Sequence, residues 1–130
     1  MVGGTATMML GDHHTAIDYF QRALRLSPLD PNIFNAQGGL AIAYFLLGNY
    51  EEGLKYATDA LRHHSNFLPG LRMAMACHAQ LGNIEAAQKL WQKLSLLSPS
   101  ERVSEIRKRG WRDQDIAKFE EAYRLAGMPE

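Results

Sequence analysis

Histidines and carboxylates are the side chains of this sequence that could bind a metal ion. The five histidines include two adjacent pairs, His13-His14 and His63-His64. Neighbouring residues on a helix point about 100° apart, so neither pair can bind one ion as a unit. An aspartate lies four residues from one histidine of each pair, which gives two ligands where zinc needs three or four. The sequence therefore predicts solvated histidines at helix ends and no metal site.

No residue pattern in the chain indicates catalysis. The sequence has neither a nucleophile–base–acid set nor a glycine-rich loop that would bind phosphate. Cys77 is the single cysteine, so an internal disulfide is impossible. Its apolar neighbours indicate a small buried side chain rather than a reactive thiol. We therefore expect a chain that is not itself an enzyme and that binds no cofactor.

A basic cluster near the C-terminus has the composition of a nucleic-acid contact. It consists of Arg107, Lys108, Arg109 and Arg112 around Trp111. Such a cluster could contact phosphates and stack on a base. The acidic residues that flank it are Glu101, Glu105, Asp113 and Asp115. The chain also balances 14 basic against 14 acidic residues, so no overall field favours nucleic acid or an anionic membrane. We interpret the cluster as a solvated linker, with Trp111 tucked under a last helix.

A sequence motif that occurs three times indicates the helices that carry the candidate residues. Leucine and glycine, followed by Asp or Asn, occur at Gly11, Gly48 and Gly82, with spacings of 37 and 34 residues. The motif includes further matched positions 5, 9, 12 and 17 residues after each glycine. A period near 34 residues with small residues at fixed places is typical of stacked helical hairpins.

Each repeated position has a mechanical reason. Glycine can end the first helix of a hairpin in a left-handed turn at low cost. The residue that follows can cap the second helix: Asp12, Asn49 and Asn83. Small residues then stand where two helix backbones must approach: Ala16, Gly53 and Ala87.

The pattern resembles the tetratricopeptide repeat family, which is built from helix–turn–helix units of about 34 residues. The resemblance covers about residues 8–100. Gly53 departs from the family, which usually has Ala there, and we expect it to loosen the middle hairpin by roughly 0.5–1 kcal/mol. His78 stands at a packing position of the family, so the resemblance implies a partly buried histidine.

A narrower likeness rests on three stretches: ALRLSPLDP at 23–31, GNYEEG at 48–53 and LAGMPE at 125–130. Together they resemble the C-terminal region of bacterial class III adenylate/guanylate cyclase-like signalling proteins, and of related winged-helix regulators. In such proteins the catalytic or DNA-binding domain lies upstream of the repeats. The likeness therefore implies an upstream effector domain outside this chain.

The expected architecture is all-α, a tetratricopeptide-like solenoid of about three hairpins with C-terminal capping helices. We divide it into an incomplete repeat over 1–28, repeats over 34–65 and 68–99, and capping helices over 100–130. The expected helices cover 13–26, 34–47, 50–64, 68–81 and 84–97. Ser100 is expected to cap a short helix before Gly110, and Asp113 a last helix to Ala126. One apolar face of that last helix should dock on the preceding hairpin.

The start of the chain departs from the repeat pattern. A full first helix should precede Gly11, but Gly3-Gly4-Thr5 is a poor helix start. We therefore expect a fragment of a longer protein. The helix that lacks its partner should expose Ile17, Phe20 and Leu24, which predicts a two-fold homodimer through the N-terminal face.

The first helix of each hairpin should line a concave groove that binds protein or peptide. The expected groove residues are Asn35, Ile42, Phe45, Arg72, Ala76 and Gln80. An alternative is that Ile42 and Phe45 pack against a missing upstream helix or the C-terminal cap. Chaperone-binding members of the family grip a terminal carboxylate with Lys and Asn. The corresponding places here hold Gly38, Gly39, Ile42, Pro69 and Met73, so that clamp is absent.

The leading functional prediction is a non-catalytic scaffold that binds a protein, a peptide or its own upstream effector domain. A homo-oligomerisation module that pairs effector domains is the alternative, and an RNA-binding helical repeat is disfavoured by the neutral charge. The longest apolar run is too short to span a bilayer, and the start lacks the features of a signal peptide. We therefore expect a cytoplasmic protein without a membrane partner.

Overall fold

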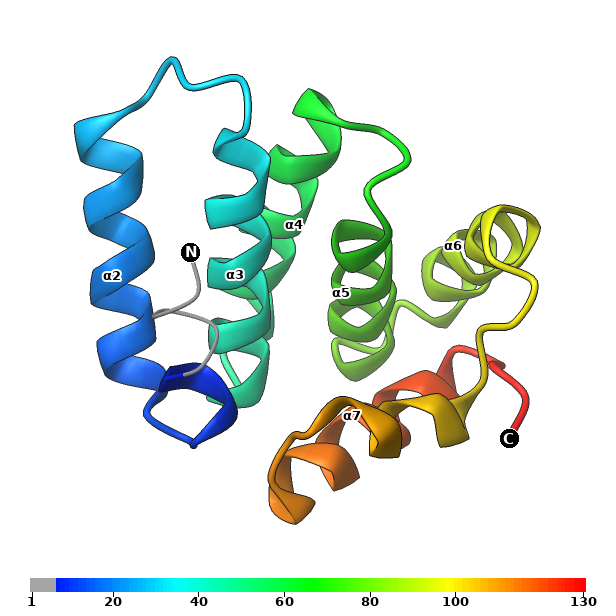
Figure 1. Cartoon of the computed structure of the whole chain (residues 1–130). Helices are drawn as coiled ribbons and strands as arrows, with labels where there is room; N and C mark the ends of the chain where they lie inside the picture. Colours follow the sequence, from blue (N-terminus) through cyan, green and yellow to red (C-terminus); the bar gives the residue numbers. More distant parts are fainter. Residues whose placement is uncertain (1–6) are drawn as a thin grey trace.

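The computed structural model describes residues 7–130, and all regular structure in that range is helical. Residues 7–9 are helical and precede the turn at Gly11. The following helices are α2 (His13–Leu26), α3 (Ile33–Leu46), α4 (Tyr50–His63), α5 (Leu68–Gln80), α6 (Ile84–Leu97), the 3-10 helix η1 (Val103–Arg109) and α7 (Asp113–Leu125). Figure 1 shows them as a row of antiparallel hairpins followed by a crossing segment. The all-α prediction is confirmed, and the bounds of the five helices expected between residues 13 and 97 agree to within one residue. The poor helix start at Gly3-Gly4-Thr5 lies outside the described residues.

The repeated glycines form the predicted turns. Gly11, Gly48 and Gly82 have φ of 93°, 81° and 84°, in the left-handed region. In each turn the amide of the residue after the glycine donates to a carbonyl five residues back, as Asn83 does to His78 at 2.8 Å. A Cβ on Gly82 would meet no atom within 4 Å. Backbone conformation, and not lack of space, therefore requires glycine there.

The predicted helix caps are confirmed at one position and wrong at others. The Asp12 carboxylate accepts a hydrogen bond from the Thr15 amide at 3.2 Å. Asn49 and Asn83 occupy the N-cap positions of α4 and α6, but their side chains make no capping bond. Asp113 is the first residue of α7 and not its cap, which leaves its carboxylate favourably placed in the first helical turn. Ser100 is likewise not the cap of η1, because Arg102 occupies that position.

Neighbouring helices pack closely because small residues stand at their crossings. Ala16, Gly53 and Ala87 are all buried, as the repeat pattern predicts. A Cβ on Gly53 would lie 2.9 Å from the Cys77 sulfur and 3.2 Å from the Ala41 carbonyl oxygen. The loosening expected from Gly53 therefore stays a prediction, and the structure adds that the missing methyl group makes room for α3 and α5 at this crossing.

The last helix folds back instead of extending the row of hairpins. α7 packs mainly against α5 and η1, and it crosses beneath the end of α5 in Figure 1. Lys118 donates to the Leu46 carbonyl oxygen at the end of α3, at 2.8 Å. The face predicted to dock is buried: Ile116, Phe119, Ala122, Tyr123 and Ala126. The C-terminal segment therefore closes one end of the concave side formed by α3 and α5.

Within residues 7–130, none of the helices combines the length and apolar character that crossing a bilayer requires.

Candidate binding groove

Two adjoining cavities lie between α3, α5 and the C-terminal segment, and we refer to them together as the groove. Their volumes are about 190 Å³ and about 460 Å³, and both are open to solvent on one side. Ile42, Pro69 and Trp111 line both cavities. The smaller cavity is also lined by Met73, Phe119 and Tyr123, and the larger by Asn35, Gly38, Gly39 and Phe67. The groove is therefore continuous and mainly apolar.

The two glycines of α3 shape the larger cavity. A Cβ on Gly39 would overlap the ring of Phe20, and one on Gly38 would lie 2.7 Å from the ring of Phe67. These glycines thus let one aromatic ring from each neighbouring hairpin lie directly on α3. Phe20 is only 1% exposed as a result, so the prediction that it contributes to an exposed N-terminal face is wrong. Ile17 and Leu24 remain half-buried.

The structure brings together only part of the predicted groove. Asn35, Ile42 and Arg72 line the cavities. Phe45 and Ala76 line neither cavity, and their side chains are 1% and 0% exposed. Gln80 is partly exposed but lines neither cavity.

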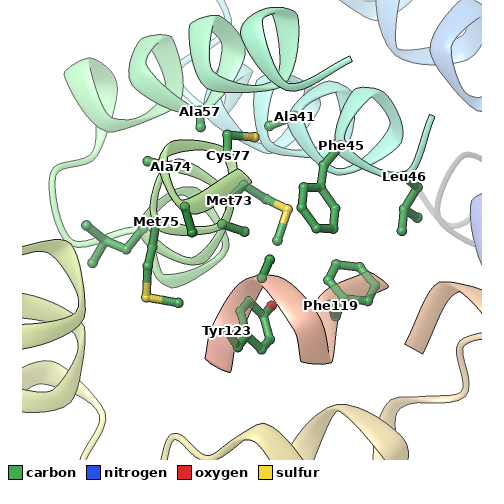
Figure 2. Packing of buried hydrophobic residues seen from close by; sticks show 14 of the residues in the cluster. Ala41, Phe45, Leu46, Ala57, Met73, Ala74, Met75, Cys77, Phe119 and Tyr123 are labelled. Atoms are coloured by element: carbon green, nitrogen blue, oxygen red, sulfur yellow. The ribbon is translucent and has the colours of Figure 1, made fainter. Parts of the chain in front are cut away.

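Phe45 is buried because the C-terminal cap covers it. Its ring stacks on that of Phe119, with centroids 5.4 Å apart, and Figure 2 shows the two rings facing each other beside Met73. The alternative that Phe45 packs against the cap is therefore confirmed. Ile42 lies about one turn earlier in α3 and stays half-buried at the groove wall.

Trp111 contributes to the groove in a way that sequence reasoning missed. Its ring centroid is 5.2 Å from that of Phe119, so it does lie against the last helix as expected. The same side chain also lines both cavities. The turn that aims it depends on Gly110, whose φ is 84°. In the sequence, the only sign of this role is that Trp111 follows the turn residue Gly110. That sign does not tell where α7 docks, so it does not place Trp111 in the groove.

A buried ion pair lies beside the smaller cavity, which Arg72 lines and Glu101 does not. Arg72 donates to both carboxylate oxygens of Glu101, at 2.6 and 3.0 Å. Burial raises the pKa of Glu101, but the hydrogen bonds and charge of Arg72 outweigh it and hold that pKa below its usual value. Burial lowers the pKa of Arg72, but the hydrogen bonds and charge of Glu101 raise it by more. The net shift of the Arg72 pKa is therefore upward. Both groups stay charged at neutral pH, so the predicted groove residue Arg72 is held by Glu101.

The basic cluster is neutralised by carboxylates, as the sequence predicts. Arg107 donates to both oxygens of Glu120 at 2.9 and 3.0 Å, a partner not foreseen from the sequence. Lys108 pairs with Glu105 at 3.0 Å, and Arg112 with Asp115 at 3.1 Å. Arg109 is the most loosely held, because its nearest approach to Glu101 is 3.9 Å.

One histidine departs from the predicted solvated state. His13 is 5% exposed, and its Nε2 lies 3.4 Å from a carboxylate oxygen of the fully buried Asp115. Burial lowers the pKa of His13, and Asp115 only partly offsets this shift. The predicted solvation holds for His14, His63 and His64, which are exposed. Among the described residues, no group of three or more potential ligands could hold a metal ion.

Two other predicted side chains are placed as expected. Cys77 is fully buried between Ala41 and Ala57 in Figure 2, and burial raises the pKa of its thiol to about 12. A thiol with such a pKa is not a nucleophile at neutral pH. His78 is half-buried, with its Nδ1 3.3 Å from the side-chain nitrogen of Asn83.

Comparison with known proteins gives the same architecture. Residues 4–66 match the family model of the tetratricopeptide repeat. The solved second tetratricopeptide domain of human RPAP3, in complex with the HSP70 peptide SGPTIEEVD, superposes with a TM-score of 0.67 at 18% identity. The match covers 92% of this chain and 88% of that domain. The chain has a tetratricopeptide-like repeat fold.

The tetratricopeptide-like array is also similar to parts of longer curated proteins. DnaJ homolog subfamily C member 7 from Homo sapiens and from Mus musculus are each 28% identical to it over 90 residues. The aligned region covers 69% of this chain but 18% of each relative, so the array spans about a fifth of the length of those proteins.

Proposed function

We propose that the tetratricopeptide-like array is an interaction module that holds a short segment of another protein in the groove. The observation that carries this proposal is the pair of adjoining cavities joined by Ile42, Pro69 and Trp111. The larger cavity, at about 460 Å³, falls within the range of about 300–1,000 Å³ common for ligand sites. The RPAP3 domain provides a precedent, because the same fold holds a peptide there.

The residues at the places of the chaperone clamp favour apolar side chains over a terminal carboxylate. All five residues at the places of the chaperone clamp line the groove: Gly38, Gly39, Ile42, Pro69 and Met73. None of them can donate a side-chain hydrogen bond to a carboxylate. We therefore propose that apolar side chains of the bound segment fill the two cavities, and that a free C-terminus is not required.

The proposal can be tested by selecting peptides from a random dodecapeptide library displayed on phage. Binding of the selected peptides is measured by fluorescence anisotropy and mapped by amide chemical shifts in NMR spectra. Ile42→Asp should abolish binding, because it puts a carboxylate on the shared wall of both cavities. Leu96→Asp is the matched control, since Leu96 is 83% exposed on α6 and lines neither cavity. Equal binding by both variants would refute the groove as the site.

We propose further that the module belongs to a bacterial nucleotide-cyclase-like signalling protein, or to a winged-helix regulator. The support is the likeness of the stretches 23–31, 48–53 and 125–130 to the C-terminal regions of those proteins. In that setting the groove would hold a partner or the protein's own effector domain. The gene sequence upstream of Met1 tests this directly, because an open frame without a cyclase or winged-helix domain would contradict it.

Self-association is the second candidate function, and it would pair upstream effector domains. The end of α2 favours it, because Leu26 is 75% exposed and Leu29 in the following loop is 94% exposed. Light scattering should then report a dimer, and Leu26→Asp should return the protein to a monomer. A monomer at high micromolar concentration would exclude this function for the chain.

A further inference from the structure

We infer that the segment bound in the groove carries a side-chain carboxylate next to an apolar residue, and that Arg109 binds this carboxylate. This inference rests on the proposed function of the groove. Its starting point is charge: two arginines line the smaller cavity, and no aspartate or glutamate lines either cavity.

Only one of the two arginines is fully engaged. Arg72 makes two short bonds to Glu101 and is 12% exposed. Arg109 approaches the same carboxylate at 3.9 Å, which is too far for a hydrogen bond, and its side chain is 37% exposed. Ser98 also donates to Glu101, at 3.1 Å. One carboxylate thus faces two guanidinium groups, and this end of the groove carries one positive charge in excess.

The surroundings of Arg109 determine what its partner must look like. Arg109 is the last residue of η1, and Gly110 turns the chain so that Trp111 lines the same cavity. The remaining wall of this cavity is mainly apolar, with Ile106 and Phe119 among its residues. A carboxylate that reaches Arg109 therefore brings the neighbouring side chain of its own molecule against an apolar wall. Because the low-dielectric wall strengthens the ion pair, the two contacts reinforce each other.

A peptide fits this geometry better than a fatty acid does. The groove is two cavities side by side, which suits two side chains on the same face of a bound peptide. Asn35 lines the far cavity with an amide that can donate to and accept from a peptide backbone. The guanidinium group of Arg109, which would bind the carboxylate, belongs to the C-terminal segment and not to the helical hairpins.

The test uses nonapeptides with acetylated and amidated ends, so that no terminal carboxylate is present. Each peptide carries Leu, Ile or Phe beside a glutamate, and its matched partner has glutamine in place of the glutamate. In anisotropy titrations the glutamate peptides should bind at least about tenfold tighter, the range expected for a charge-assisted hydrogen bond. Arg109→Gln should remove this preference. Lys108→Gln is the matched control, because Lys108 is adjacent, 72% exposed and paired outside the groove.

Each outcome separates this inference from the proposed function. Equal binding of glutamate and glutamine peptides, together with loss of binding in Ile42→Asp, would overturn the inference and leave the groove as a peptide site. Equal loss of the preference in Arg109→Gln and Lys108→Gln would also overturn it. If no peptide binds, the proposed function fails as well. If dodecanoate binds with dependence on Arg109 and peptides do not, the occupant is a fatty acid and the inference is wrong.

Discussion

Phe45 of α3 and Phe119 of α7 stack face to face, with ring centroids 5.4 Å apart and ring planes 24° apart. Both side chains are almost fully buried, at 1% and 2% exposed. The contact joins the second helix hairpin to the C-terminal helix across the concave side (Figure 2). It explains why the groove is confined to the part of the concave side that α7 leaves open.

Phe119→Ala should strongly destabilise the protein. The substitution removes a buried ring that contacts Phe45, Trp111 and Tyr123. Buried Phe→Ala substitutions cost about 3–5 kcal/mol, so urea denaturation should show a lower unfolding midpoint. Leu125→Ala is the control on the same helix, because Leu125 is 43% exposed. If the two variants unfold at the same urea concentration, α7 does not hold the fold as described.

Gly82→Val should lower the melting temperature, although no atom blocks the new side chain. The cause is the φ of 84° at Gly82, where a Cβ costs at least about 1–2 kcal/mol. Asn tolerates the left-handed region better, so Gly82→Asn should melt between the valine variant and the wild type. Equal melting temperatures for all three proteins would show that this turn does not need its left-handed conformation.

Gly53 and Cys77 should be energetically coupled. A methyl group at Gly53 would lie 2.9 Å from the Cys77 sulfur, so Gly53→Ala should lower the free energy of unfolding. Cys77→Ala removes that sulfur and should reduce the cost of Gly53→Ala in the double variant. Part of the cost should remain, because the Ala41 carbonyl oxygen lies 3.2 Å from the new Cβ. A double-mutant cycle by urea denaturation measures this coupling, and strict additivity would contradict it.

Acid should destabilise the protein through His13. Burial lowers its pKa below 6.5, the nearby positive charges of Arg112 and Lys118 add to this, and Asp115 opposes it. The unfolded chain therefore binds a proton more readily than the folded chain. The stability linked to His13 is complete above about pH 6.5 and is lost as the pH falls below that value.

His13→Gln should flatten this pH dependence between pH 7.5 and 5.5, measured by urea denaturation. The pKa of His78 is also lowered by burial, so both proteins are compared in a His78→Gln background. Glu101 does not interfere between pH 7.5 and 5.5. Its pKa is lowered in the folded protein, so its contribution to stability is lost only at lower pH. An unchanged slope in the His13 variant would show that this residue does not couple protonation to folding.

Sequence alone determined the helices and the turns between them. The repeated motif at Gly11, Gly48 and Gly82 predicts left-handed turns, because the required backbone conformation is local and only glycine adopts it at low cost. Small residues at Ala16 and Ala87 predict close helix crossings because the antiparallel hairpin fixes which positions face each other. The resulting bounds of the five hairpin helices agree with the structure to within one residue.

Tertiary structure alone decided which of those faces remain open. The apolar face of α7 predicts that this helix packs against another part of the protein. Any apolar surface of sufficient size could cover that face, so the sequence does not say which one does. Only the folded chain shows that α7 covers Phe45 and buries His13 beside Asp115. The groove follows from the same event, since Trp111 and Arg109 reach α3 and α5 only once the C-terminal segment has folded back. Hydrophobic burial is non-directional, so a sequence specifies that a face is covered more readily than what covers it.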